Sequence, residues 1–363
     1  MGAAIAGVVI NGKFLSAAPT AVHRVAYELT RALAVYGQQH DVSIALPPGG
    51  GLKWPSPSIP ANEVGHLNGI AWEQLSLPGA TRGRLLVNLC NMTPFMVRSG
   101  LTMVHDAQVF TTPRSYGQLR SAWARLHIRL AGSAQLGLLT VSEFAKKELV
   151  ERRIAPPERI HVIHNGVDHV LRTPPDDAIL KTLGLTPRRY ALALANLQPH
   201  KNIGILLRAF EKPELAGAHT GAHGAGQSHR LRRSGLSHAT QRGVCRVCER
   251  SRNEQLADPC TGGVHAITDR GIWAATRGGH VAGNPCSDRP LRRATRSMRP
   301  RRLDGRPHDP DAWSAALSRL VRQPALWDEL ANAGRKQAAH FTWDAAARKL
   351  MRVISQVTRV QSR

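Results

Sequence analysis

The first 170 residues alternate between short apolar runs and longer segments that carry a helical stripe of apolar positions. The runs have the length of buried parallel strands, and they lie at residues 3–10, 42–46, 85–88, 101–105, 138–141 and 160–164. Three predicted helices lie between them: a stripe that begins behind the potential cap Thr20, then 115–131 and 143–152. Strands that alternate with helices in this way predict a doubly wound α/β domain with a parallel sheet.

Residues 190–210, YALALANLQPHKNIGILLRAF, predict a strand, a turn and a helix. An apolar run is followed by a polar turn and by Lys201, and apolar residues then recur at i, i+3, i+4 and i+7 from Ile203. The first N–H groups of a helix lack partners and attract anions. With Lys201 beside them, they suit a phosphate or diphosphate. The other interpretation is a solvated lysine at a helix terminus.

Ligands of doubly wound sheets bind beyond the carboxyl ends of the strands. Three predicted loops are therefore of interest: 11–19, 105–106 and 196–201. His105 ends a predicted strand in the sequence VHDAQVF. It either faces a ligand or is hydrogen-bonded locally to Asp106.

Two stretches resemble hallmark patterns of the group 1 (family 4) glycosyltransferases. ANLQPHKNIGILLRAF, residues 195–210, is similar to the opening of that family's donor domain, and TVSEFAKKELVERRIAPPERIHVIHNGVD, residues 140–168, is similar to the pattern before it. The resemblance covers about residues 3–214 and about 307–357. It implies a GT-B fold of two Rossmann-like domains. The acceptor-side domain is residues 1–170 and the nucleotide-sugar domain is residues 171–340. A terminal helix at residues 341–363 packs back on the first domain.

The resemblance also implies an activity and a set of site residues. The chain looks like a retaining glycosyltransferase that moves a hexose from a nucleotide sugar, with mannose from GDP-mannose as one candidate. The implied acceptor is lipid-linked or an oligosaccharide, in exopolysaccharide or lipopolysaccharide synthesis. His105 matches the histidine near the transferred sugar and is the expected catalytic residue. The expected donor-binding residues are Asn196, Lys201, Ser142 and Asn165. Lys201 and the helix start would neutralise the departing diphosphate without a metal or a cofactor.

The chain is strongly basic, because its 363 residues include 49 Lys and Arg against 25 Asp and Glu, a net charge of +24. This balance suits phosphorylated substrates, an anionic membrane surface or nucleic acid. No apolar run approaches the ~18 residues that span a bilayer, and the start, MGAAIAGVVI, reads as a first strand rather than a signal peptide. Five cysteines without framework spacing are typical of a reducing compartment. We therefore expect a cytoplasmic location, either free or peripheral to the inner membrane.

Residues 219–306 differ in composition from the rest of the chain. They hold 17 Arg, no Lys, 6 Asp or Glu, and four of the five cysteines, without helical or strand periodicity. Three interpretations compete: a basic nucleic-acid-binding insert, a small zinc module built on Cys245 and Cys248, and a segment translated out of frame. A single CxxC pair is a weak zinc signal. Trp273 is the segment's one aromatic residue, which argues against nucleic-acid binding.

The genetic code tests the out-of-frame interpretation. When the codons of residues 269–281 are read from their second base, every position permits TEGFGLPPxEAM. This is similar to the family's second hallmark, which contains the two glutamates that hold the nucleotide sugar. The same shift permits LPEVCG at residues 294–300, where the family has LPEVxG. Our hypothesis is a pair of compensating frameshifts, near residues 213–218 and 306.

This hypothesis has a physical consequence. A segment rich in arginine and poor in aliphatic residues buries too little apolar surface to offset its ordering entropy. We therefore expect residues 219–306 to be disordered or poorly packed, the second domain to be incomplete, and activity to be low or lost. The alternatives to an active transferase are an inactive, frame-shifted pseudo-enzyme and a basic nucleic-acid-binding protein. For the transferase, no nucleic acid is expected as a partner.

Helical patterns return in three C-terminal segments, at residues 312–322, 324–339 and from 341 onward. The expected cap of the last helix is Thr342 or Asp344. Asp309 and Asp311 spell DxD, a motif that elsewhere binds a metal–nucleotide complex. Because the motif lies just before a helix, capping is the better interpretation.

Overall fold

The structure is a computed structural model of the chain. It describes residues 7–37, 40–111, 117–172, 190–194, 208–209, 211–215, 219–223, 244–245, 267–268, 271–274 and 309–361. The chain divides into two compact units. Unit 1 is Met1–His169 with Phe341–Arg363, and unit 2 is Val170–His340.

Unit 1 is built on a parallel sheet of seven described strands. The strands are β1 (Val8–Asn11), β2 (Val42–Leu46), β3 (Ala61–Glu63), β4 (Leu85–Asn88), β5 (Gly100–Met103), β6 (Gly137–Thr140) and β7 (Ile160–Val162). Their order across the sheet is β3-β2-β1-β4-β5-β6-β7. The chain therefore moves outward from β1 to β3, returns beside β1 with β4, and moves outward on the other side. This is a doubly wound sheet, and the predicted α/β fold class is confirmed.

The apolar runs formed strands where they were predicted, with one useful difference. The bounds of β2 and β4 coincide with the predicted runs. β5 and β7 each end two residues earlier than predicted. His105 therefore lies in the loop after β5 rather than in the strand. Because its side chain is not bound by the alternation of a strand, the loop alone sets its direction.

The helices of unit 1 connect the strands. They are α1 (Ala21–Leu33), α2 (Gly69–Ala71), η3 (Trp72–Ser76), α3 (Leu77–Ala80), α4 (Gln108–Thr111), α5 (Gln118–Ala134) and α6 (Glu143–Glu151), together with the 3-10 turn η1 (Gly12–Ser16). The predicted Thr20 cap is confirmed, since its side chain accepts from the His23 N–H. The continuous α2–η3–α3 segment was not predicted. It contains Gly69 and Pro78 and has poor helix propensity, but it buries Trp72 and Leu77 completely.

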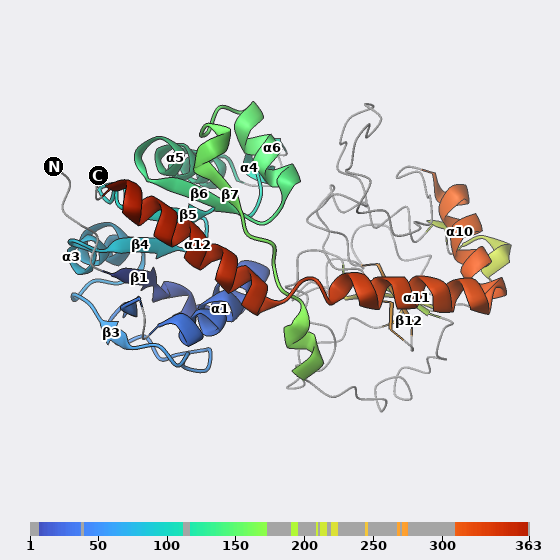
Figure 1. Cartoon of the computed structure of the whole chain (residues 1–363). Coiled ribbons are helices and arrows are strands. Elements are labelled where there is room, and N and C mark those ends of the chain that lie inside the picture. Colours follow the sequence, from blue (N-terminus) through green and yellow to red (C-terminus); the bar gives the residue numbers. More distant parts are fainter. Residues whose placement is uncertain are drawn as a thin grey trace. The chain divides into compact units, whose positions relative to one another are not determined.

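The last helix, α12 (Trp343–Gln361), packs against α1 within unit 1 (Figure 1). Thr342 is its cap, because its hydroxyl accepts from the Ala345 N–H. Trp343 is buried; its indole Nε1–H donates to His169 Nδ1 at 3.0 Å, and its backbone N–H donates to Asp168 Oδ1 at 2.8 Å. Buried residues of α12 join the same apolar cluster as β1, β2 and α1, so the C-terminal helix is part of the core of unit 1.

Unit 2 contains a second sheet with the strand order β10-β9-β8-β12-β11. Its strands are β8 (Tyr190–Leu194), β9 (His219–His223), β10 (Val244–Cys245), β11 (Ile267–Thr268) and β12 (Gly271–Ala274), and its helices include α10 (Pro310–Arg322) and α11 (Pro324–Ala338). β9 and β12 both pair in parallel with β8.

Four of these strands fall within residues 219–306, where we expected disorder or poor packing. The expectation of disorder or poor packing stays a prediction for this segment. Pairing is a backbone interaction, so a segment poor in aliphatic residues can still add strands beside an apolar strand such as β8. The remaining residues of 219–306, including Cys248, lie outside the described residues.

Candidate functional site

A cluster of polar side chains lies where the sheet of unit 1 changes direction. β1 and β4 are neighbours, yet their chain connections lead to opposite sides of the sheet. Asn11 and Asn88 are the last residues of these two strands. Both are buried, and Asn11 Nδ2 donates to Asn88 Oδ1 at 3.1 Å. In open α/β sheets this switch point, beyond the carboxyl ends of the strands, is where ligands bind.

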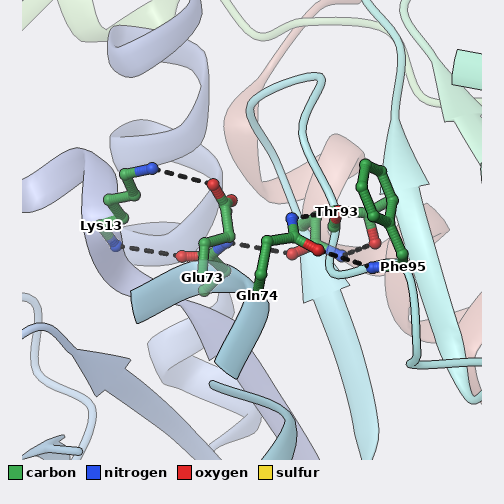
Figure 2. A network of polar contacts seen from close by, with 7 residues as sticks. Lys13, Glu73, Gln74, Thr93 and Phe95 are labelled. Carbon is green, nitrogen blue, oxygen red and sulfur yellow. Dashed lines mark hydrogen bonds and ion pairs between the residues drawn. The ribbon is translucent and has the colours of Figure 1, made fainter. Parts of the chain in front are cut away.

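A buried carboxylate completes the centre of the cluster. Glu73 in η3 is 2% exposed, and it accepts a hydrogen bond from Asn11 Nδ2 at 2.9 Å. It also forms an ion pair with Lys13 Nζ at 2.8 Å (Figure 2). Lys13 lies in η1, the turn that follows β1, and Asn11 Oδ1 accepts from its backbone N–H. Buried charges need such partners, because desolvation of an unpaired carboxylate is costly.

The cluster extends into the loop that follows β4. Asn88 Nδ2 donates to the hydroxyls of Thr93 and Thr102 at 3.1 and 3.2 Å. Gln74, next to Glu73, donates to the Thr93 carbonyl at 3.1 Å and accepts from the Phe95 N–H at 3.0 Å (Figure 2). A network whose polar groups are paired in this way holds its members in one arrangement. These hydrogen bonds therefore hold the loop at residues 93–95 against Gln74 and Asn88.

His105 lies beside this cluster. Its backbone N–H donates to Asn91 Oδ1 at 2.9 Å, and its ring Nε2 lies 2.8 Å from the carbonyl oxygen of Leu89, the residue after β4. A carbonyl only accepts, so the proton is on Nε2 and Nδ1 carries a lone pair. Burial lowers the pKa of His105 below its usual value, which favours the neutral ring. Local pairing with Asp106 is not observed: the Asp106 carboxylate accepts from the Gln108 N–H.

The other four predicted site residues have different outcomes. Ser142 is the N-cap of α6, where its hydroxyl accepts from the Ala145 N–H at 3.1 Å. Asn165 follows β7 and is half-buried. Asn196 and Lys201 lie outside the described residues, as does the predicted helix after them, apart from residues 208–209. The structure therefore places His105 beside the switch point and gives Ser142 a capping role.

Sequence reasoning missed Lys13, Glu73 and Asn88. Asn88 had a visible signal, because both VVIN and LLVN end an apolar run with an asparagine. Glu73 precedes Leu77 by four residues, so an acidic residue shares a helix face with a fully buried leucine. Without the helix assignment, that spacing had no meaning. The long-range pairing with Lys13 had no local signal.

The DxD motif has a structural role in unit 2. The Asp309 carboxylate accepts from the N–H groups of Asp311 and Ala312, each at 3.0 Å, and caps α10. Asp311 pairs with Lys212 Nζ at 2.6 Å. The pair lies in a cavity of about 590 Å³, whose described lining is Lys212, Asp311, Ser314, Ala315, Ser318, Arg319, Arg322 and Gln323. The capping interpretation is confirmed. Within the part of the chain that the structure describes, no three His, Cys, Asp or Glu side chains gather as metal ligands.

The fold is shared with solved structures. Anabaena Alr3699/HepE, solved in complex with UDP and glucose, aligns with a TM-score of 0.63 at 14% identity, over 96% of this chain and 99% of that chain. Sucrose-phosphate synthase from Thermosynechococcus elongatus aligns with a TM-score of 0.61 at 15% identity, over 98% and 99%. At these identities the likeness shows the fold alone, which is the two-unit α/β architecture of GT-B proteins.

Sequence comparison is more specific for unit 1. Residues 22–171 match the family described as Glycosyltransferase Family 4. A D-inositol 3-phosphate glycosyltransferase of Nocardioides sp. is 27% identical over 291 residues, which are 70% of this chain and 62% of that protein. The O-antigen chain mannosyltransferase B of Escherichia coli is 31% identical over 123 residues, 32% of each protein. The chain spans just under two thirds of the length of the D-inositol 3-phosphate glycosyltransferases that it matches over the longest stretch.

Proposed function

We propose that this protein is a glycosyltransferase that moves a hexose from a nucleotide sugar to a lipid-linked or oligosaccharide acceptor. The proposal includes a retaining, metal-independent reaction in cell-surface polysaccharide synthesis, with GDP-mannose as one candidate donor. The observation that carries it is the polar cluster at the switch point, whose members Glu73 and Asn88 lie within residues 22–171, the stretch that matches a glycosyltransferase family. The solved relative named with UDP and glucose, and the relative named as a mannosyltransferase, support the donor class.

The chemistry of the cluster suits a sugar substrate. Sugars present hydroxyl groups that donate and accept hydrogen bonds, and the cluster offers both kinds of partner. Lys13 uses one of its three N–H donors on Glu73, and its side chain remains 34% exposed. The lone pair on His105 Nδ1 can accept from a sugar hydroxyl, because the ring is held through Nε2. His105 is accordingly proposed as the residue that contacts the transferred sugar.

The phosphate side of the proposal rests on the resemblance. Lys201 and the helix start that follows it are proposed to neutralise the departing diphosphate, with Asn196 in the same turn. Ser142 and Asn165 complete the proposed donor-binding set. The cap made by Ser142 leaves its hydroxyl proton able to donate to a ligand, because the hydroxyl accepts from the helix.

A second candidate is an inactive, frame-shifted product. It is favoured by the observation that residues 219–306 lack the two glutamates that the shifted reading restores. Such a chain would keep the folded unit 1 and lose turnover.

Among the described helices, none is both long and apolar enough to cross a bilayer.

The test combines binding with turnover. Thermal unfolding of the full chain is measured with and without GDP and UDP, because a ligand that binds the native state raises the midpoint. Release of nucleoside diphosphate from UDP- and GDP-hexoses is then followed with a lipid-linked pyrophosphate acceptor. A shift with one nucleotide and turnover with its hexose support the active enzyme. A shift without turnover shows that a nucleotide site is kept in a chain that does not transfer the sugar. No shift with either nucleotide, together with no turnover, contradicts the active enzyme and supports the pseudo-enzyme with a broken donor domain.

A further inference from the structure

Helix α5 exposes an apolar stripe to solvent. Leu119, Trp123 and Leu126 follow one another at i, i+4 and i+7, so they share one face of the helix. All three are exposed, and Leu119 is 89% exposed. The opposite face, with Ile128 and Ala131, is buried in unit 1. We call the three exposed residues the α5 stripe. A large exposed apolar surface on a helix marks an interaction site.

The charges along α5 all have one sign. The helix carries Arg120, Arg125 and Arg129 and no Asp or Glu. Arg120 and Arg129 are exposed, and no carboxylate among the described residues pairs with them. They follow Leu119 and Leu126 by one and three positions, which places them on the two flanks of the stripe. An exposed apolar ridge between arginines is the pattern of a helix that lies on an anionic lipid surface.

The α5 stripe is connected to the site by one aromatic contact. Trp123 packs edge-on against Phe95, with ring centroids 5.6 Å apart, and also against the buried His127 at 4.6 Å. Phe95 is bonded through its N–H to Gln74, which follows Glu73. Met96, the next residue of the loop, is 81% exposed. The loop that borders the polar cluster therefore also borders the α5 stripe.

We propose that the α5 stripe, together with Met96, docks unit 1 on an anionic lipid bilayer. The apolar side chains enter the headgroup boundary, and Arg120 and Arg129 contact lipid phosphates. A second copy of this chain fits the surface less well. A symmetric contact would place the same arginines opposite one another, and α5 offers no carboxylate to pair with them. The proposal deepens the proposed function and rests on it in one respect: docking presents a lipid-linked acceptor to the polar cluster beside the loop.

The size of the effect follows from the groups involved. Each arginine near an anionic surface strengthens binding by roughly five-fold. Replacing Leu119 and Leu126 by glutamate removes apolar contact and adds two repelled charges. We expect L119E/L126E to weaken binding at least about 30-fold. Because both positions are exposed, the variant keeps its unfolding midpoint.

The experiment is co-sedimentation of the full chain with vesicles that contain no donor and no acceptor. One set contains phosphatidylcholine with 30 mol% phosphatidylglycerol (about the anionic fraction that gives a strong surface potential), and the other contains phosphatidylcholine alone. The variants are L119E/L126E, R120Q/R129Q and the control V35E, whose position is 77% exposed on another segment of unit 1. Light scattering of each protein reports its oligomeric state.

The expected result is binding to the anionic vesicles that L119E/L126E abolishes, R120Q/R129Q weakens by about ten-fold or more, and V35E leaves unchanged. Equal binding by wild type and L119E/L126E would overturn the proposal. So would equal binding to both vesicle types, or a dimer that L119E/L126E dissociates while vesicle binding is absent. The assay involves no sugar transfer, so a failure of docking is distinguishable from a failure of the proposed transferase activity.

Discussion

Lys13 Nζ lies 2.8 Å from Glu73 Oε2, and this ion pair joins two segments 60 residues apart at the end of β1. The two partners differ in exposure, since the Glu73 side chain is 3% exposed and that of Lys13 is 34% exposed. The carboxylate is thus buried, while the ammonium group is partly exposed to solvent. Glu73 therefore fixes the orientation of Lys13 and Asn11 at the switch point of the sheet.

The first prediction concerns Glu73. Glu73→Ala removes one of the two acceptors of the Asn11 amide and leaves Lys13 without its counter-ion. We expect the free energy of unfolding to fall by about 3 kcal/mol, because breaking a buried pair by removing one partner is strongly destabilising. Urea unfolding followed by circular dichroism measures this. Glu151→Ala is the matched control: its pair with Lys147 is exposed, and its loss costs only about 0.5 kcal/mol. Equal costs in the two variants would contradict a structural role for the Lys13–Glu73 pair.

The second prediction concerns His105. We expect His105→Ala to lower kcat/KM at least about 100-fold while the nucleotide-dependent shift in unfolding midpoint persists, because the side chain is proposed to contact the transferred sugar and not the nucleotide. Steady-state kinetics measure the change, with the hexose donor that the thermal-shift and turnover test selects. His161→Ala, at a half-buried histidine on β7, is the control and keeps wild-type activity. Loss of activity in both variants would remove the case for a specific role of His105.

The third prediction concerns pH. Burial is the largest cause that lowers the pKa of His105 and of His127 below the usual 6.5. As the pH falls below 6.5, the unfolded chain takes up protons that the folded chain does not. The free energy of unfolding therefore decreases until the pH lies below the folded-state pKa values. Each histidine contributes at most about 1.4 kcal/mol per pH unit. Unfolding midpoints between pH 7.5 and 5 measure the slope, and His127→Phe, which keeps a ring beside Phe95, reduces it. An unchanged slope in that variant would argue against the assignment.

The fourth prediction concerns the anchor of the C-terminal helix. Trp343 is buried, and its indole Nε1–H and backbone N–H donate to His169 and Asp168. We expect Trp343→Ala to destabilise unit 1 by about 4 kcal/mol, the usual cost of removing a large buried aromatic side chain. Thermal unfolding measures it, and Val360→Ala, at an exposed position of the same helix, is the control. Gly166→Ala should act in the same direction, since its new methyl group would overlap the backbone nitrogen of Trp343.

The fifth prediction separates capping from metal binding at Asp309. Asp309→Ala removes the acceptor of two N–H groups at the start of α10, which costs about 1 kcal/mol of stability. Under the capping role, EDTA leaves turnover unchanged in both wild type and variant. If EDTA abolishes turnover of the wild type and leaves the residual turnover of Asp309→Ala unchanged, the DxD motif binds a metal. Assays with and without EDTA, with a readdition of Mg²⁺ or Mn²⁺, distinguish the two outcomes.

The local pattern was enough for most of unit 1. Apolar runs of the right length became β2 and β4 at their predicted bounds, and Thr20 became the cap of α1. These features depend on nearest neighbours in the chain, on side-chain periodicity and on unpaired N–H groups at a helix start. The position of Asp309 just before a helix likewise distinguished a helix cap from a metal-binding motif.

The sequence by itself determined the α/β class, the helix caps and the family resemblance, because these reside in short stretches of residues. Only the tertiary structure decided which polar groups meet. Glu73 lies in a helix that its own propensity does not favour, and burial of Trp72 and Leu77 places its carboxylate against Asn11 and Lys13. The α5 stripe became a surface only once the opposite face of its helix was buried in the core. Burial and long-range pairing are properties of the packed chain, and no local pattern contains them.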